Sequence, residues 1–469
     1  MNQIDAVARR AAAAAHPFAS LPDARRAELL DAVADALDAA ADELVAVAGE
    51  ETALPEGRLR GELARTTAQL RKFGDVVREG GYLEATIDHA DPSDVPPRPD
   101  LRRVLRPIGP VAVFAASNFP FAFSVAGGDT ASALAVGCPV IVKTHPGHPR
   151  TSELTSRLVA AALAEAPEGV FQTVAGFEQG LALVDAEPIE AVAFTGSLRA
   201  GRALLERCTA RPRPIPFYGE LGSLNPVVVT PDADAARGLE LAAGLAGSFQ
   251  LGDGQFCTKP GLVFVPEGST LEAALPAHVA VGEPRMLTQA IADGYETGRQ
   301  RASAIPGVEV IAGGGSATAP TVLAADAATL LAHDELLDEV LGPVTVLVRY
   351  RDAVALDSAL GMLEGSLTMT LHAEPGEDIT GLADWAASRA GRVLFGGWPT
   401  GVAVSWAQHH GGPWPATNTV FTSVGATAVR RFLRPVTYQD APASVLPPAL
   451  RDDNPLGIPR RVDGVLQLP

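Results

Sequence analysis

The sequence contains little cysteine and no long apolar stretch. Three cysteines in 469 residues cannot form a disulfide framework. No run of about 18 uninterrupted apolar residues occurs, so we expect no transmembrane helix. The N-terminus lacks a basic segment followed by an apolar core, so we also expect no signal peptide. Together these features predict the reducing cytoplasm, where a reactive thiol would survive.

Positive charge and metal-binding patterns are also scarce. The chain has 37 basic and 55 acidic residues, a net charge of −18, which argues against nucleic acid or an anionic membrane as a partner. Its histidines show no metal-ligand spacing, so we expect no metal site. His409 and His410 belong to the Gly-rich segment 409–413, which we expect to shape a pocket.

The length predicts two or three domains of the α/β class. Residues 4–80 carry apolar residues at helical spacing. From residue 107 on, short apolar runs alternate with helical stretches, which predicts parallel sheets covered on both faces. A second such block spans about 223–415. Residues 101–106 alternate like an exposed strand, and the tail after about 425 is expected to pack on a neighbour.

The chemistry centres on Cys257, within residues 254–258 (GQFCT). A lone cysteine is most often a small buried apolar residue. Here residues 117–120 (SNFP), 194–197 (FTGS) and 220–222 (ELG) add an amide donor, a glycine turn and a carboxylate. These are the groups that a cysteine needs to act as a covalent catalyst on a carbonyl.

Each of these groups also has an ordinary structural alternative. Glu220 lies between glycines, and we expect burial to raise its pKa to suit a general base. It could equally be a glutamate in a surface turn. The Asn118 amide could stabilise an oxyanion together with the Cys257 backbone N–H, or it could cap a turn or helix.

Three segments have features of a dinucleotide site. Lys143 ends a predicted strand, where ligands of α/β sheets bind, although it could be a solvated lysine. Gly196 follows another strand and Gly201 comes near a helix start, where backbone N–H groups attract a pyrophosphate. The spacing is not G-x-G-x-x-G, so this signal is weak alone. Glu339 could bind ribose hydroxyls or simply end a helix.

Taken together, these segments resemble the aldehyde dehydrogenase superfamily over nearly the whole chain. The resemblance rests on the order and spacing of residues 117–120, Lys143, 194–197, 220–222, 254–257 and 339–343 (EVLGP). It implies that Cys257 is the nucleophile, Glu220 the general base and Asn118 the oxyanion donor. The cofactor residues it implies are Lys143, His145, Thr195, Gly196, Ser197, Gly201, Leu221 and Glu339.

The resemblance also implies an architecture. We expect a dinucleotide-binding domain (1–92 and 107–222), a catalytic domain (223–427) and a small β oligomerisation element formed by an arm (93–106) and the tail (428–469). Both large domains would contain a parallel sheet. The exposed edges of the arm and tail predict a homodimer or homotetramer.

One departure from the pattern of the superfamily predicts the cofactor. Many NAD-preferring relatives carry a glutamate three residues after the lysine, where this chain has Pro146. Such a glutamate would bind the ribose 2′-hydroxyl and repel a 2′-phosphate, so its absence predicts that NADP is accepted or preferred, with NAD possible. His145 lies close by.

Residues 117–130, 220–223, 257–261, 399–402 and 430–436 resemble, more narrowly, the α-ketoglutarate semialdehyde (2,5-dioxovalerate) dehydrogenase branch. This implies a small oxo-acid semialdehyde as substrate. Medium- or long-chain aldehydes are the alternative, because fatty aldehyde dehydrogenases are close to this branch. Acyl transfer to coenzyme A and a non-catalytic role are more remote. The residues that could line the substrate funnel are Phe121, Phe123, Phe249, Phe256 and Trp406.

Overall fold

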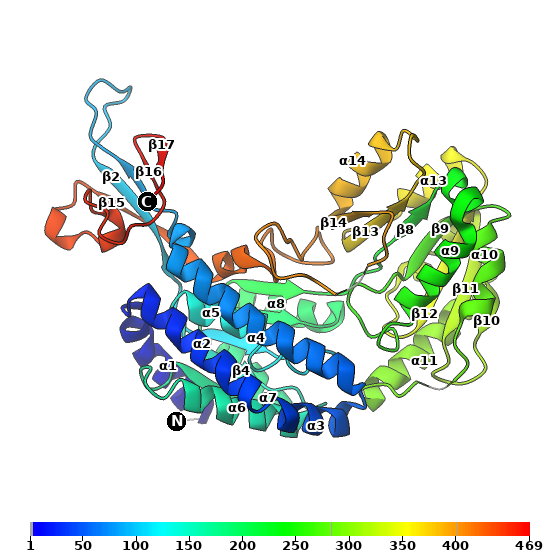
Figure 1. Cartoon of the computed structure of the whole chain (residues 1–469), viewed down its shortest axis with the longest axis horizontal. Coiled ribbons are helices and arrows are strands. Elements are labelled where there is room, and N and C mark those ends of the chain that lie inside the picture. Colours follow the sequence, from blue (N-terminus) through cyan, green and yellow to red (C-terminus); the bar gives the residue numbers. More distant parts are fainter. Residues whose placement is uncertain (1–2, 283, 400) are drawn as a thin grey trace.

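The chain begins with four helices that pack on one another. The computed structural model describes residues 3–282, 284–399 and 401–469, so Thr400, within one of the segments above, lies outside the described residues. The helices α1 (Gln3–Ala19), α2 (Asp23–Ala39), α3 (Ala41–Thr52) and α4 (Glu56–Glu79) confirm the helical interpretation of 4–80. In Figure 1, α2 and α4 run side by side across the larger lobe, and their apolar faces contribute to its core.

The sheet of this lobe has five strands in the order β5-β4-β3-β6-β7, and all neighbours are parallel. Its strands are β3 (Val111–Phe114), β4 (Val140–Lys143), β5 (Phe171–Val174), β6 (Ala191–Thr195) and β7 (Phe217–Glu220). Helices α5 (Gly128–Ala135), α6 (Pro149–Ala162), α7 (Phe177–Asp185) and α8 (Leu198–Ala210) connect them. Because carboxyl ends of parallel strands meet at one edge, Lys143, Thr195 and Glu220 lie along the same edge.

A seven-stranded sheet forms the second lobe, in the order β10-β11-β12-β9-β8-β13-β14. Its strands are β8 (Val227–Val229), β9 (Leu262–Pro266), β10 (Glu309–Gly313), β11 (Thr321–Asp326), β12 (Val344–Tyr350), β13 (Ser366–His372) and β14 (Ala390–Phe395). All pairs are parallel except β10 with β11, because the short connection between them permits only a hairpin. The helices of this lobe are α9 (Pro231–Phe249), α10 (Thr270–Ala274), α11 (Gln289–Ser303), α12 (Ala327–Ala332), α13 (Ala353–Leu360) and α14 (Thr380–Arg389).

A third sheet projects from the first lobe as an arm (Figure 1). Its order is β15-β2-β1-β16-β17, with β1 (Thr86–Asp88), β2 (Leu101–Pro107), β15 (Leu433–Gln439), β16 (Arg460–Val462) and β17 (Val465–Gln467). β1 pairs with both β2 and β16 and therefore belongs to this sheet. The sheet thus begins at Thr86, earlier than residue 93, the expected start of the arm. The outer limits of the domains otherwise stay a prediction.

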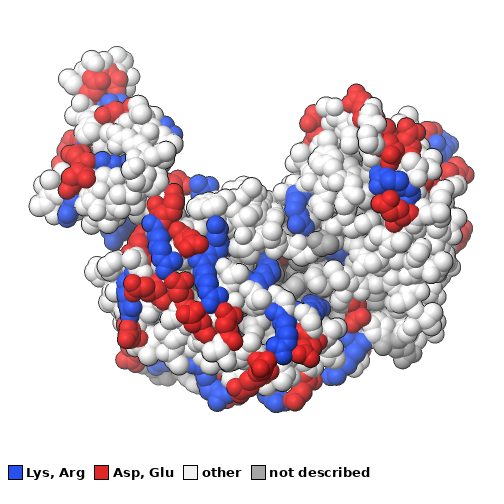
Figure 2. Space-filling model, viewed as in Figure 1, with Lys and Arg blue, Asp and Glu red and all other residues white. Residues whose placement is uncertain are grey.

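Short 3₁₀ turns complete the chain at Gly81–Leu83, Leu275–His278, Asp334–Leu337, Ala426–Phe432, Ala443–Val445 and Pro448–Leu450. Within the described ranges, no helix is long and apolar enough to cross a membrane. Figure 2 shows acidic and basic side chains interleaved over the helices of the first lobe. It also shows patches of basic side chains in the hollow between the lobes, with few acidic side chains beside them.

Candidate active site

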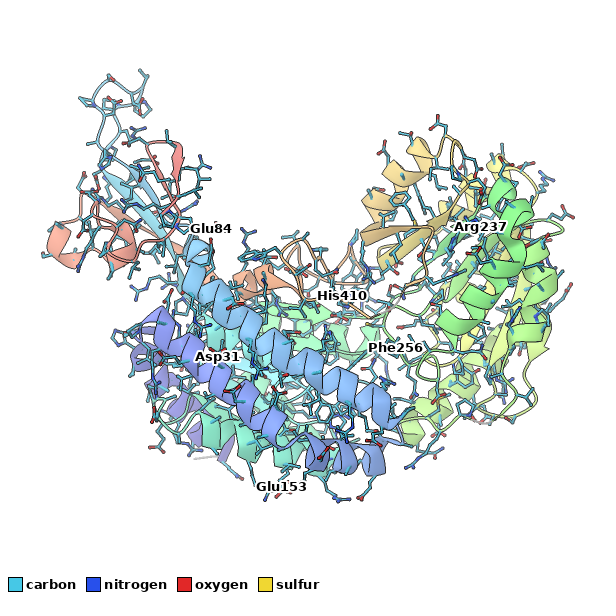
Figure 3. All side chains as sticks on the ribbon, viewed as in Figure 1. Asp31, Glu84, Glu153, Arg237, Phe256 and His410 are labelled. Carbon is cyan, nitrogen blue, oxygen red and sulfur yellow. The ribbon has the colours of Figure 1, made fainter. Side chains whose placement is uncertain are left out.

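Cys257 lies in the loop between α9 and β9, directly after Phe256, which Figure 3 shows between the two lobes. A tight turn precedes it, because Gly252, Asp253 and Gly254 all have positive φ. The Asn225 side chain then fixes the loop, since its amide donates to the Cys257 carbonyl at 2.8 Å. The cysteine is half-buried and lines the cavity beside the first sheet.

Two buried side chains accompany the thiol. Glu220 ends β7 and is 3% exposed, and His410 is fully buried. Their Nε2 and Oε1 atoms are 2.9 Å apart, and the Cys257 Sγ lies 3.6 Å from His410 Nε2. The Ser423 hydroxyl donates to the other carboxylate oxygen at 2.5 Å. The donor atoms of Glu220, Cys257 and His410 lie within 4.8 Å of one another, close enough to exchange protons.

The Asn118 side chain lies beside this group, and its amide donates to the Gln255 carbonyl at 2.9 Å. The backbone carbonyl of Asn118 accepts a hydrogen bond from Arg58 Nη2 at 2.7 Å, which fixes the loop. An asparagine amide has two N–H groups, so the second one is the candidate oxyanion donor. The structure thus brings the three predicted catalytic side chains together.

The pKa of Glu220 differs from the expectation. Burial raises the pKa of the Glu220 carboxyl, but the charge and hydrogen bonds of His410, with the Ser423 hydroxyl, outweigh it and lower the pKa below its ordinary value. The expected rise is therefore wrong, because these partners lie far from Glu220 along the chain. Burial and the Glu220 carboxylate raise the pKa of the Cys257 thiol well above its ordinary value.

A cavity of about 460 Å³ opens beside Cys257 along the carboxyl edge of the first sheet. Every predicted cofactor residue except Gly201 lines it: Lys143, His145, Thr195, Gly196, Ser197, Leu221 and Glu339. Gly201 instead packs α8 against the first lobe, because a Cβ there would lie 2.1 Å from the Leu221 side chain. A glycine at this position therefore serves close packing rather than contact with a ligand.

The residues of the cavity fit a dinucleotide. The N-terminus of α8 faces it, and the Ser197 hydroxyl caps this helix by accepting from the Ala200 N–H at 3.3 Å. Free N–H groups at a helix start attract a pyrophosphate. Lys143 supplies a cation, and Leu181, Leu204 and Ile291 add apolar walls that suit a flat ring.

The aromatic residues predicted for the substrate funnel are dispersed. Phe121 and Phe249 are at most 1% exposed and belong to hydrophobic cores, which removes them from contact with a ligand. Trp406 is 50% exposed and lies against Lys72. Phe256 packs on Phe119, with ring centres 5.1 Å apart, outside the cavity lining.

Phe123 is the aromatic residue that approaches the reacting groups, with its ring centre 6.5 Å from that of His410. His410 was not predicted as a partner of Glu220, although its Gly-rich segment was expected to shape a pocket. Figure 3 places His410 and Phe256 in the centre of the molecule, between the lobes. The signal available was the position of this histidine next to Gly411 and Gly412.

Known proteins similar to this chain agree with this fold. The sequence profile of the aldehyde dehydrogenase family matches residues 1–362. The chain is 47% identical over 464 residues to alpha-ketoglutaric semialdehyde dehydrogenase 2 of Azospirillum brasilense, covering 95% of this chain and 88% of the relative. It is 42% identical to alpha-ketoglutaric semialdehyde dehydrogenase of Acinetobacter baylyi, covering 99% and 92%.

Among solved structures, aldehyde dehydrogenase 21 of Physcomitrella patens aligns with a TM-score of 0.79 at 22% identity, over 94% of this chain and 91% of that one. The chain belongs to the aldehyde dehydrogenase family, whose members use NAD or NADP. Both the recognition of the family and the α/β architecture expected from the sequence are thereby confirmed.

Proposed function

We propose that this protein oxidises α-ketoglutarate semialdehyde to 2-oxoglutarate with NAD(P), through a thioester on Cys257. The similarity over nearly the whole chain to two alpha-ketoglutaric semialdehyde dehydrogenases carries this proposal. The grouping of a reachable thiol, a buried carboxylate and an amide donor supports it.

The first half of the reaction forms a bond between the Cys257 sulfur and the aldehyde carbon. The thiol hydrogen bonds to Glu220, which takes the proton as sulfur attacks. Because the pKa of Glu220 is lowered, its carboxylate is ionised at neutral pH and can accept that proton. The Asn118 amide stabilises the oxyanion of the thiohemiacetal. Lys143, Ser197 and Glu339 line the cavity that would hold NAD(P), and the bound cofactor would supply the acceptor for the hydride of this carbon.

The second half hydrolyses the thioester. Glu220 releases the first proton to solvent and takes another from a water molecule whose oxygen attacks the acyl carbon. The C–S bond then breaks, Glu220 gives this proton to the leaving sulfur, and the carboxylate product departs. His410 holds Glu220 in place through the 2.9 Å contact. A water-activating carboxylate is not needed for acyl transfer to coenzyme A, which argues against that alternative.

NADP is the proposed cofactor, with NAD as a weaker one. Pro146 follows His145 where a glutamate would repel the 2′-phosphate. The His145 Nδ1 accepts from the Gly147 N–H at 3.0 Å, so the ring proton resides on Nε2 and can be donated to a phosphate. Burial lowers the pKa of His145 to about 3, which keeps the ring neutral and leaves Lys143 as the nearby cation.

We also propose that the arm joins copies of the chain into a homodimer or homotetramer. The exposed side chains of β17 and the two open edges of the arm sheet support this. A catalytic thiol functions only while it is reduced, which supports a cytoplasmic location.

The test compares NADPH and NADH formation by the purified protein on α-ketoglutarate semialdehyde, succinate semialdehyde and hexanal. The proposal expects the highest kcat/KM for α-ketoglutarate semialdehyde and a higher value with NADP than with NAD. A preference for hexanal would move the assignment to fatty aldehydes. Activity that persists in Cys257→Ala would overturn the mechanism.

A further inference from the structure

Helix α4 presents a buried polar face to the loop that carries Asn118. Arg58, Glu62, Arg65 and Gln69 recur at helical spacing on one side of the helix. Arg58 donates to the Asn118 carbonyl, and Glu62 Oε1 accepts from the N–H groups of Phe121 and Ala122. Gln69 is 2% exposed, and neither polar atom of its side chain has a partner. Such a face requires an explanation, because buried polar groups are normally paired.

Arg65 is a member of this face whose charge acts on the reacting groups, Cys257 and Glu220. Its Nε donates to the Val402 carbonyl at 3.1 Å, and its guanidinium lies 5.4 Å from the centre of the Phe123 ring. These contacts fix the side chain, yet Nη1 and Nη2 are both enclosed and have no hydrogen-bond partner. Two adjacent free nitrogens match the geometry of a carboxylate.

Glu62 does not cancel this charge at neutral pH. Burial raises the pKa of Glu62 to about 7, so its carboxyl is only partly ionised there. Its Oε1 is occupied by two backbone N–H groups. Within the described part of the chain, the Glu62 charge acts on Arg65, but neither Nη1 nor Nη2 of Arg65 has a hydrogen-bond partner. The positive charge of Arg65 is therefore available to a ligand.

A second unpaired arginine comes from the other lobe. Arg392 lies on β14, and its Nε and Nη2 are enclosed without a partner. The preceding residue, Gly391, packs on the loop that carries His410, because a Cβ at 391 would lie 2.0 Å from the Gly411 carbonyl oxygen. The charge of Arg392 also acts on Cys257. Neither arginine lines the cavity beside Lys143, so the thiol has a separate set of neighbours here.

We propose that Arg65 and Arg392 form the subsite that binds the far carboxylate of the substrate, so that the enzyme selects short aldehydes carrying a negative charge over neutral ones. This inference rests on the proposed oxidation at Cys257. The two cations come from different lobes, and the substrate anion would accept from the side-chain nitrogens that have no partner in either arginine. The basic patches in the hollow of Figure 2 are in keeping with an anionic substrate entering between the lobes.

The test measures kcat/KM for α-ketoglutarate semialdehyde and for pentanal, a neutral aldehyde of the same chain length. Arg65→Gln and Arg392→Gln should each lower the value for the semialdehyde at least about tenfold, the loss typical of one charged hydrogen bond, and leave pentanal within about threefold. Arg65→Lys should restore only part of the loss, because lysine lacks the planar fork. Arg71→Gln, on the exposed side of α4, is the matched control and should change neither.

A second measurement uses the unaltered enzyme and does not depend on how the variants fold. Glutarate should compete with pentanal, whereas the neutral glutaramide should not. Equal inhibition by both compounds, or equal losses for both aldehydes in the variants, would overturn the carboxylate subsite and leave the oxidation mechanism standing. An unaltered enzyme that oxidises neither aldehyde would overturn the proposed function itself.

Discussion

The Cys257 thiol lies beside an ionised carboxylate, which decides how its reactivity depends on pH. Burial and the negative charge of Glu220 raise the pKa of the thiol well above its ordinary value. The thiolate is therefore a minor form at neutral pH, and its fraction increases about tenfold per pH unit below the pKa.

Alkylation by iodoacetamide should follow this fraction in the free enzyme. We expect the rate at Cys257 to rise about tenfold per unit between pH 7 and 9. Peptide mass spectrometry would identify the modified residue, and the buried Cys138 and Cys208 are internal controls. A rate that levels off below pH 8 would contradict the raised pKa.

His410 connects the carboxylate with the thiol at the same scale. His410→Gln replaces the ring that approaches Glu220 and Cys257, so Glu220 loses its neighbour and is no longer held for proton transfer. We expect kcat to fall about 100-fold, within the range for general acid–base groups. The neighbouring His409→Gln should cost less than threefold. Similar losses in both variants would show that the loop matters rather than the His410 ring.

The buried Glu62 carboxyl makes the stability of the folded chain depend on pH. Its pKa is about 7 in the folded chain against an ordinary 4.5, so the folded state binds more protons between these values. Stability should consequently decrease as pH rises through this window. Glu62→Gln removes the ionisable group, so its melting temperature should increasingly exceed that of the unaltered protein from pH 5 to 8. The corresponding difference in the free energy of unfolding should reach about 3 kcal/mol. The exposed Glu43→Gln is the control. A difference that is constant with pH would refute the shift.

At the scale of elements, sequence patterns predicted the helices and most strands because their periods are local. The apolar runs at 111–114, 140–143 and 191–194 became neighbouring parallel strands, which placed Lys143 and Gly196 on one edge. Contacts between distant segments were beyond these patterns. His410 is 190 residues from Glu220 along the chain, and the lowered pKa of Glu220 depends on that contact.

The substrate side was the least predictable for a similar reason. Phe121 and Phe249 are aromatic, as the residues of a substrate funnel often are. In the folded chain, however, both side chains pack inside hydrophobic cores. Arg65 and Arg392 belong to different elements, and only the folded chain brings both near Cys257.

The turn before Cys257 constrains the position of the whole loop that carries the thiol. Gly254 has φ of 66°, and a Cβ there would lie 2.3 Å from the Gly342 backbone. Gly254→Ala should push the thiol loop away from the loop after Glu339 and lower kcat more than about tenfold, because small displacements of reacting groups are costly. Gly247→Ala, within α9 and with open space around it, is the matched control. It should leave kcat unchanged and stabilise the helix by up to about 1 kcal/mol. Equal activity of the two variants would show that this turn does not position Cys257.

At the scale of the whole molecule, the arm stands apart from both lobes and has little core of its own. Its buried apolar cluster contains few side chains, among them Ile87 and Leu450. At its end, β17 exposes Val465 by 64% and Leu466 by 58%. An apolar strand at an open sheet edge is stable in solution when another chain covers it.

The assembly can be tested at this edge. Light scattering should give the mass of a dimer or tetramer for the unaltered protein, and the double variant Val465→Asp with Leu466→Asp should dissociate, because two carboxylates would be buried in the contact. Val354→Asp changes a side chain of similar exposure, 72%, on α13 in the second lobe, and should leave the mass unchanged. A monomeric unaltered protein would remove the assembly, and a double variant of unchanged mass would place the contact elsewhere. Since β17 lies in the arm rather than beside Cys257, dissociation should reduce thermal stability more than kcat/KM at the isolated site.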